Sequence, residues 1–383
     1  MKDNKINILM LSAGMISGAF RRMMDIIENI DGKRFQIFVA YKPDYAEWGK
    51  HEIDLIIKAG AKIVSLRGKW LFGLRGFMDL WNILRKEQID ILHSWDVLGV
   101  PSRIIGKFAG VTIVEEFGNP PPALISEISL KHYLINKVTS VFVDGFVSCS
   151  NGVMKKYQDK KPIFLKNKVL SVVYNCVDVP HFDLSKRDRI FLRKKYSLGH
   201  HETILTNIGY FNEQKAQSDL LKAFKKVASN RWNVRLFLVG WGRLENELKE
   251  VAEDLGLKDR VIFTGKLTRP QVFEILSITD LFVLSSHWEG FGIVLAEAMA
   301  MGKPVLSTDT DGSREVVENG KTGVLVPIKR PEILAQAILD LLEKPELMAK
   351  MGEEGLKRVT KLFNCEQFIK GYEDFYKAVL SRN

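Results

Sequence analysis

Short apolar runs rich in β-branched residues alternate along the chain with longer amphipathic stretches. The runs predict buried strands. They are Ile6–Leu11, Phe35–Ala40, Lys62–Leu66, Ile89–His93, Thr112–Glu116, Gly145–Cys149, Leu170–Tyr174, Ile204–Gly209, Arg235–Val239, Val261–Thr264, Leu281–Ser285, Val305–Ser307 and Val324–Val326. Between them, apolar positions recur at helical spacing, as in Ala19–Ile30, Arg75–Lys86, Lys215–Ala228 and Leu244–Leu255. This alternation predicts parallel α/β sheets that are covered by helices on both faces.

The alternation is interrupted between Pro180 and His201, where a highly charged segment begins at Ser185. Each side of the interruption holds enough strand–helix units for one doubly wound sheet. We therefore predict an N-terminal Rossmann-like domain over residues 1–180, a linker over 181–201 and a second Rossmann-like domain over 202–363. Residues 364–383 are predicted to form a helix that packs back on the first domain. Because ligands of such sheets bind beyond the carboxyl ends of the strands, two facing sheets predict a central cleft.

Composition and charge are those of a globular chain with an anionic partner. Apolar residues make up 46% and charged residues 27% of the chain. Lys and Arg number 56 against 46 Asp and Glu, a net charge of +10. Up to Pro180 there are 25 basic and 18 acidic residues, so +7 of the excess lies in the first domain. Such an excess favours a nucleic acid, a membrane surface or a phosphorylated substrate as the partner.

Cysteine usage and the absence of long apolar stretches point to the cytoplasm. Cys149, Cys176 and Cys365 are too few and too scattered for a disulfide framework or a cysteine zinc site. The run Ile6–Leu11 is too short for a signal-peptide core, and no stretch approaches the ~18 apolar residues of a membrane span. We expect a cytoplasmic protein that meets a membrane, if at all, from its inner face.

Residues 285–305 form the segment with the clearest candidate chemistry. A strand ends near Ser286, a glycine-containing loop follows, and a helix is predicted from about Phe291. Gly290 and Gly292 let a ligand approach the backbone closely. The free amides and the positive dipole end of the helix favour an anionic group. The same pattern also fits a capped surface helix with no ligand.

Two carboxylates in this segment fit a sugar nucleotide. Glu289 in the loop could accept hydrogen bonds from sugar hydroxyls, and Glu297 in the helix could hold a ribose. The two lie eight residues apart, and Glu289 is the first residue of the sequence Glu-Gly-Phe-Gly. This arrangement resembles the E-x7-E motif of retaining glycosyltransferases, most closely family 4.

The resemblance extends over nearly the whole chain. Its further segments are Ser17–Ala19, Ile208–Lys215, Leu238–Gly242, Gly312–Val317 and Asn319–Pro327. Their order along the chain matches that of the family. The resemblance implies the GT-B fold, in which two Rossmann-like domains face a cleft. Residues 1–180 would then be the acceptor-binding domain, and residues 202–363 the domain that holds most of the nucleotide sugar.

The resemblance also implies roles for individual residues. The catalytic residues would be Glu289, His93 and Lys215, with Glu289 placing donor hydroxyls, His93 touching the donor sugar and Lys215 neutralising the diphosphate. The donor-binding residues would be Gly18, Gly209, Lys215, Phe291, Gly292 and Glu297. Fixed cations and helix-end amides can stabilise the departing diphosphate, so we expect neither a metal nor a cofactor. The resemblance further implies same-face substitution, in which the departing phosphate oxygen helps to take the acceptor proton.

Three positions depart from the family pattern. Tyr210 stands where an arginine is common, Trp241 where an acidic or polar residue is usual, and Cys176 where a glycine is usual. Arg243 and Arg314 are both candidates for the missing cation, and the sequence does not choose between them.

The sequence gives less specific signals for the acceptor-binding surface. Residues 68–85 and 129–138 mix aromatic and basic side chains, which suits an anionic membrane surface and a lipid-linked acceptor. Trp70 and Phe72 are the side chains expected to be exposed there. A helix core face would give much of the same pattern.

The sequence therefore predicts a retaining glycosyltransferase that uses a UDP- or GDP-sugar. Its acceptor would be a glycan, a lipid-linked glycan or a small molecule, in cell-surface polysaccharide or glycolipid synthesis. An epimerase or phosphorylase of the same fold is an alternative, although no segment indicates a pyridoxal site. A basic nucleic-acid-binding protein is another, but no recognised binding module occurs, so we expect no nucleic acid partner.

Overall fold

The computed structural model describes residues 5–11, 18–41, 50–66, 74–95, 99–120, 138–159, 163–177, 186–199 and 201–382. The chain divides into two compact units. Unit 1 consists of Met1–Cys176 and Cys365–Asn383, and unit 2 consists of Val177–Asn364. The chain therefore passes between the units twice. Trp70 and Phe72, expected at a membrane surface, lie outside the described residues.

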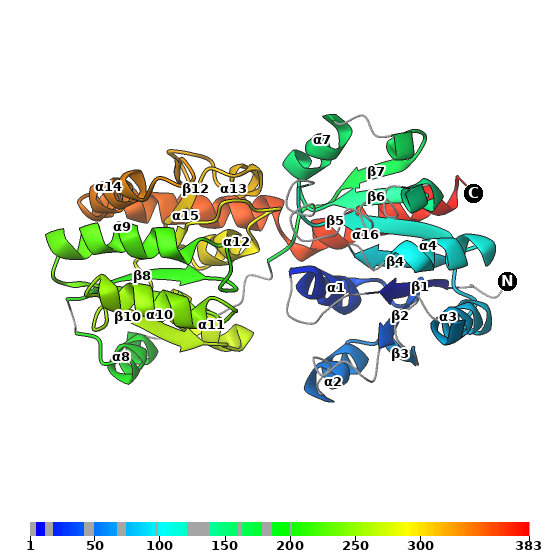
Figure 1. Ribbon diagram of the computed structural model, residues 1–383, viewed down its shortest axis with the longest axis horizontal. Coiled ribbons are helices and arrows are strands. Elements are labelled where there is room, and N and C mark those ends of the chain that lie inside the picture. The colour runs from blue at the N-terminus through cyan, green and yellow to red at the C-terminus, as the bar shows by residue number, and fades with distance from the viewer. Residues whose placement is uncertain are drawn as a thin grey trace. The chain divides into compact units, whose positions relative to one another are not determined.

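Unit 1 contains a seven-stranded parallel sheet of order β3-β2-β1-β4-β5-β6-β7 (Figure 1). Its strands are β1 (Ile6–Leu11), β2 (Phe35–Tyr41), β3 (Lys62–Ser65), β4 (Ile91–Trp95), β5 (Thr112–Phe117), β6 (Gly145–Ser148) and β7 (Val169–Val172). Its α-helices are α1 (Gly18–Asn29), α2 (Lys50–Lys58), α3 (Leu74–Lys86), α4 (Gly99–Phe108), α7 (Asn151–Asp159) and α16 (Cys365–Leu380). The last helix therefore packs in the unit that holds the N-terminus.

Unit 2 contains a six-stranded parallel sheet of order β10-β9-β8-β11-β12-β13. Its strands are β8 (Thr203–Ile208), β9 (Val234–Val239), β10 (Val261–Gly265), β11 (Leu281–Leu284), β12 (Val305–Thr308) and β13 (Gly323–Val326). Its helices are α8 (Lys186–Lys195), α9 (Gln217–Asn230), α10 (Glu245–Asp254), α11 (Arg269–Ile278), α12 (Ile293–Ala300), α13 (Asp311–Val316), α14 (Pro331–Leu342) and α15 (Pro345–Leu362). Helix α8 lies within the predicted linker, yet it packs on α11 as part of unit 2.

The strand pattern produces two-sided burial. In β1, Ile8 and Met10 join a core cluster with side chains of α1 and α16, whereas Leu9 and Leu11 join a second cluster with α3 and α4. Successive strand residues point to opposite faces, so a continuous apolar run buries both faces of a parallel sheet. The predicted two-sheet Rossmann-like architecture is confirmed.

One predicted strand is displaced. The fourth strand is Ile91–Trp95 and not Ile89–His93, because the amide of Ile89 donates to the carbonyl of Leu84 and closes the end of α3. Among the described residues, no helix is both long and apolar enough to cross a membrane.

Candidate active site

In unit 2 the strand order changes direction between β8 and β11. Strands β9 and β10 extend the sheet on one side of this pair, and β12 and β13 extend it on the other. The loops that follow β8 and β11 therefore diverge at the carboxyl edge of the sheet, where doubly wound folds bind their ligands. They are residues 209–216 and 285–292.

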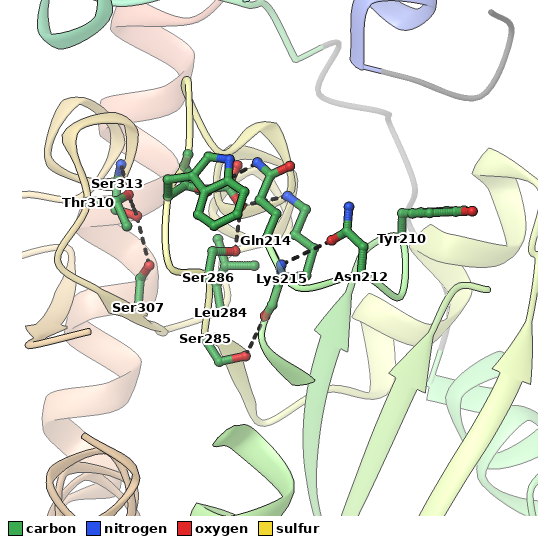
Figure 2. A network of polar contacts seen from close by, with 12 residues as sticks. Tyr210, Asn212, Gln214, Lys215, Leu284, Ser285, Ser286, Ser307, Thr310 and Ser313 are labelled. Atoms are coloured by element: carbon green, nitrogen blue, oxygen red, sulfur yellow. Dashed lines mark hydrogen bonds and ion pairs between the residues drawn. The ribbon is translucent and has the colours of Figure 1, made fainter. Parts of the chain in front are cut away.

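Hydrogen bonds join these two loops into one structure (Figure 2). The backbone N–H of His287 donates to the carbonyl of Gln214 at 2.8 Å, and Gln214 Nε2 donates to the carbonyl of Trp288 at 3.1 Å. Ser285 Oγ donates to the carbonyl of Lys215 at 2.9 Å. Side chains on the two loops are therefore held at a fixed separation.

Lys215 and Glu289 meet between the loops. Lys215 Nζ donates to Glu289 Oε1 at 2.6 Å, and Ser286 Oγ donates to the same oxygen at 2.6 Å. The Lys215 side chain is 17% exposed and that of Glu289 is 6% exposed. A Cβ at Gly209 would lie 3.2 Å from Cγ of Lys215, so the lysine stem runs across this glycine. An ion pair with so little exposure is screened weakly by solvent and can act strongly on a bound anion.

The chain around Lys215 departs slightly from the predicted helix. Ala216 has a left-handed φ of 48°, and α9 begins only at Gln217. Asn212 Oδ1 accepts the amide proton of Lys215 at 3.1 Å. Lys215 therefore stands in the loop just before the helix.

The second loop ends at Gly292, whose φ of +86° favours glycine and which caps the N-terminus of α12. Phe291 is buried against Phe363, with ring centroids 5.2 Å apart. Glu297 lies in α12 and is half-buried. Unit 2 thus gathers Gly209, Lys215 and Glu289 at one point and places Gly292 and Glu297 on the adjoining helix.

Both candidates for the missing cation, Arg243 and Arg314, are paired with carboxylates. Arg243 is paired with Glu213, and Arg314 Nε lies 2.6 Å from Asp309 Oδ1. Tyr210, at the position where the family often has arginine, is 40% exposed and points away from Lys215 in Figure 2.

A further cation near the site is Lys266, which the sequence analysis did not identify. The Tyr210 ring packs edge-on against Trp241, at a centroid distance of 5.8 Å. Lys266 Nζ lies 5.1 Å from the centroid of the Trp241 ring. The sequence does contain a signal for this residue, because Lys266 directly follows the carboxyl end of the strand β10.

The remaining predicted residues, Gly18 and His93, belong to unit 1. Gly18 is the exposed first residue of α1. His93 was expected to open into a cleft at the end of its strand, but its side chain is 0% exposed. Its ring stacks on Trp95 at 4.0 Å, and Nδ1 lies 2.8 Å from the hydroxyl of Tyr376 in α16.

Burial fixes the protonation state of His93. It lowers the pKa of His93 to about 3, with a further contribution from the Arg22 cation. The imidazole is therefore neutral at physiological pH. Arg22 itself pairs with Glu116, with Nε 2.6 Å from Oε1. The role of His93 at a donor sugar stays a prediction, and the contacts described for it are with the core of unit 1.

Comparisons with known proteins identify the family. A model of the family described as glycosyl transferases group 1 matches residues 188–358. An N-acetyl-alpha-D-glucosaminyl L-malate synthase of Bacillus anthracis is 32% identical over 306 residues, covering 78% of this chain and 77% of that protein. An uncharacterized glycosyltransferase of Methanocaldococcus jannaschii is 30% identical over 384 residues, covering 86% of this chain and 90% of that protein.

Solved structures show the same fold. HepE of Anabaena in complex with UDP-glucose has a TM-score of 0.84 at 19% identity, covering 97% of this chain and 100% of that chain. A sucrose-phosphate synthase of Thermosynechococcus elongatus has a TM-score of 0.81 at 18% identity, covering 99% and 100%. The architecture is the GT-B fold, and the chain is a glycosyltransferase that belongs to the family of glycosyl transferases group 1.

Proposed function

We propose that this protein is a retaining glycosyltransferase that moves a sugar from a UDP- or GDP-activated donor to a glycan, lipid-linked or small acceptor. The observation that supports this most strongly is the Lys215–Glu289 pair at the point where the strand order of unit 2 reverses. A cation and a carboxylate side by side suit two adjoining parts of a nucleotide sugar, which are the anionic diphosphate and the hydroxyl-rich sugar ring.

The donor would lie along the two joined loops. Lys215 would bind the diphosphate and Glu297 the ribose, and Glu289 with the amides around Phe291 and Gly292 would hold the sugar. Gly209 leaves room for the lysine stem. These groups supply positive charge to the leaving group without a metal, so we propose metal-independent transfer. Turnover that persists in excess EDTA is the expected result.

Similar proteins support both donor bases. HepE is described in complex with UDP and with UDP-glucose. A Mycobacterium tuberculosis protein that is 28% identical over 209 residues is described as a GDP-mannose-dependent mannosyltransferase. Titrations with both donor classes are therefore needed.

Retention requires either a covalent carboxylate intermediate or same-face attack. Glu289 Oε1 already accepts hydrogen bonds from Lys215 and Ser286, which suits a carboxylate that holds donor hydroxyls better than one that attacks carbon. We therefore propose same-face substitution. The acceptor oxygen forms a bond to the anomeric carbon, the bond from that carbon to the phosphate oxygen breaks, and this oxygen takes the acceptor proton.

The acceptor would bind through unit 1. The first 180 residues carry +7 of the net charge, from 25 basic and 18 acidic residues, which favours an anionic acceptor or membrane surface. We propose peripheral contact with the inner face of the membrane, in polysaccharide or glycolipid synthesis. Flotation with anionic vesicles at low salt tests the contact, and an unbound protein would contradict it.

The chemical step is tested with Lys215→Ala and Glu289→Ala. Both variants should lose transfer, because one removes the cation at the leaving group and the other the hydroxyl acceptor, while circular dichroism remains that of the wild type. NMR of the product should show the anomeric configuration of the donor. Wild-type turnover in either variant would contradict the site, and an inverted product would contradict retention.

A further inference from the structure

The two oxygens of the Glu289 carboxylate have different surroundings. Oε1 accepts hydrogen bonds from Ser286 Oγ and from Lys215 Nζ, each at 2.6 Å. Two donors use both lone-pair directions of that oxygen. No group in the described part of the chain donates to Oε2. The carboxylate therefore has one oxygen fixed by the protein and one available to a ligand.

Ser286 is itself held rigidly. Its side chain is 0% exposed, and the residue lies two positions after the end of β11. Its carbonyl oxygen accepts the hydroxyl proton of Thr308, which ends β12 and is 3% exposed. The serine hydroxyl is therefore aimed at Glu289 by two adjacent strands of the sheet, and it comes from a different loop than Lys215 (Figure 2).

We propose that Ser286 is a positioning residue for the donor sugar. Together with Lys215 it fixes Oε1, so that Oε2 faces a hydroxyl of the sugar ring. The inference rests on the proposed function, because it assumes that Glu289 meets the sugar of a nucleotide sugar. It assigns to Ser286 a part in recognising the sugar and none in recognising the nucleotide.

The test compares a bare nucleotide with its sugar. Wild type, Ser286→Ala and Ser286→Thr are titrated calorimetrically with UDP, UDP-glucose, GDP and GDP-mannose. Ser286→Ala should weaken binding of the nucleotide sugar about tenfold, the effect of losing one hydrogen bond to a charged group, and leave the affinity for the bare nucleotide within about twofold. Ser286→Thr keeps the hydroxyl and should restore most of the loss.

Ser307→Ala is the matched control. Ser307 is also 0% exposed, and its hydroxyl contacts Ser313 Oγ at 2.9 Å and not Glu289. It should leave both affinities unchanged. Equal weakening of nucleotide and nucleotide sugar in Ser286→Ala, or no weakening, would overturn the inference. A wild type that binds none of the four compounds would instead contradict the proposed function, and the inference with it.

A second, independent observation concerns the two places where the chain passes between the units. Cys176 is the last residue before the chain leaves unit 1, and Cys365 is the first residue after it returns. Their sulfur atoms lie 2.8 Å apart although the residues are 189 positions apart. The amide of Val177 also donates to the carbonyl of Phe363 at 2.8 Å, so the two crossing segments lie side by side.

We infer that Cys176 and Cys365 form a site of reversible oxidation. A hydroperoxide would oxidise the more exposed thiol, Cys365, to a sulfenic acid as its O–O bond breaks and an alcohol or water leaves. The Cys176 sulfur then attacks the Cys365 sulfur, an S–S bond forms, and water departs with the second thiol proton. A dithiol reverses the reaction by exchange.

Peptide mapping without reductant tests this on the full chain after exposure to hydrogen peroxide. A disulfide between Cys176 and Cys365 should form in the wild type. It should also form in Cys149→Ser, because Cys149 is buried elsewhere in unit 1. It should be absent from Cys365→Ser and be removed by dithiothreitol. Three unlinked cysteines in treated wild type, or a link that includes Cys149, would overturn the inference.

Discussion

Gly312, the second residue of α13, packs its backbone closely against the loop that holds Glu289. A Cβ there would lie 2.6 Å from the nitrogen of Phe291, 2.7 Å from the carbonyl carbon of Gly290 and 2.8 Å from the carbonyl oxygen of Glu289. The amide of Gly312 donates to that same oxygen at 3.2 Å. In Gly312→Ala, the methyl group must therefore displace either the loop or α13.

The size of the effect follows from these distances. Ordinary Cβ contacts begin near 3.4 Å, so the three atoms must retreat by more than half an ångström. All three belong to the backbone and cannot rotate away. Overpacking of a rigid interior costs about 1–3 kcal/mol, and we expect about 2–3 kcal/mol here. A shift of this size at Glu289 should also lower transfer about 100-fold.

Hydrogen exchange of β11 and β12 amides measures the loss of stability in unit 2 separately from unit 1. Gly32→Ala is the control, because a Cβ there would meet nothing within 4 Å. We expect weaker protection only in Gly312→Ala. Protection and turnover that match the wild type would refute the close packing of α13 on the Glu289 loop.

The remaining predictions concern the ion pair in unit 2 and the buried histidine in unit 1. A double-mutant cycle of Lys215→Met and Glu289→Gln, read from hydrogen exchange of β8, should give a coupling energy of about 1–3 kcal/mol, and additive effects would contradict the direct contact. Because burial lowers the pKa of His93 to about 3, the unfolded state binds the proton first as the pH falls below 6.5. The contribution of His93 to the stability of unit 1 is therefore complete above pH 6.5, and between pH 6.5 and 3 it falls by up to about 1.4 kcal/mol per pH unit. His93→Phe should flatten this slope in the exchange of β4 amides, and an unchanged slope would contradict the buried, neutral imidazole.

The two sheets were predictable because each strand is encoded by the local pattern of apolar residues. In β1 and β11 a run of apolar residues predicts a strand that is buried on both faces, and strands that alternate with helices allow few topologies. The place of the candidate site follows from the same pattern, since ligands of such sheets bind at the carboxyl edge. The late start of β4 follows from a hydrogen bond between the amide of Ile89 and the carbonyl of Leu84 in α3, which no hydrophobic pattern records.

The contacts within the site depend on residues far apart in the chain. Lys215 and Glu289 are 74 positions apart, and their pairing follows from side-chain directions that the pattern does not specify. The surroundings of His93 come from Tyr376, which is 283 residues away in a helix that returns to unit 1. A histidine at the end of a strand is therefore open or buried according to what a distant segment places over it.

The claim that unit 2 binds a nucleotide sugar at the Lys215–Glu289 pair is tested most directly by thermal shift. Wild type and Lys215→Ala are compared with UDP, GDP and their sugars, with Lys222→Ala as a control on the adjoining helix α9. A ligand at 100 times its dissociation constant should stabilise wild type and the control by about 2.7 kcal/mol, and should stabilise Lys215→Ala far less. Equal stabilisation of all three proteins, or no stabilisation of the wild type by any of these compounds, would contradict the account.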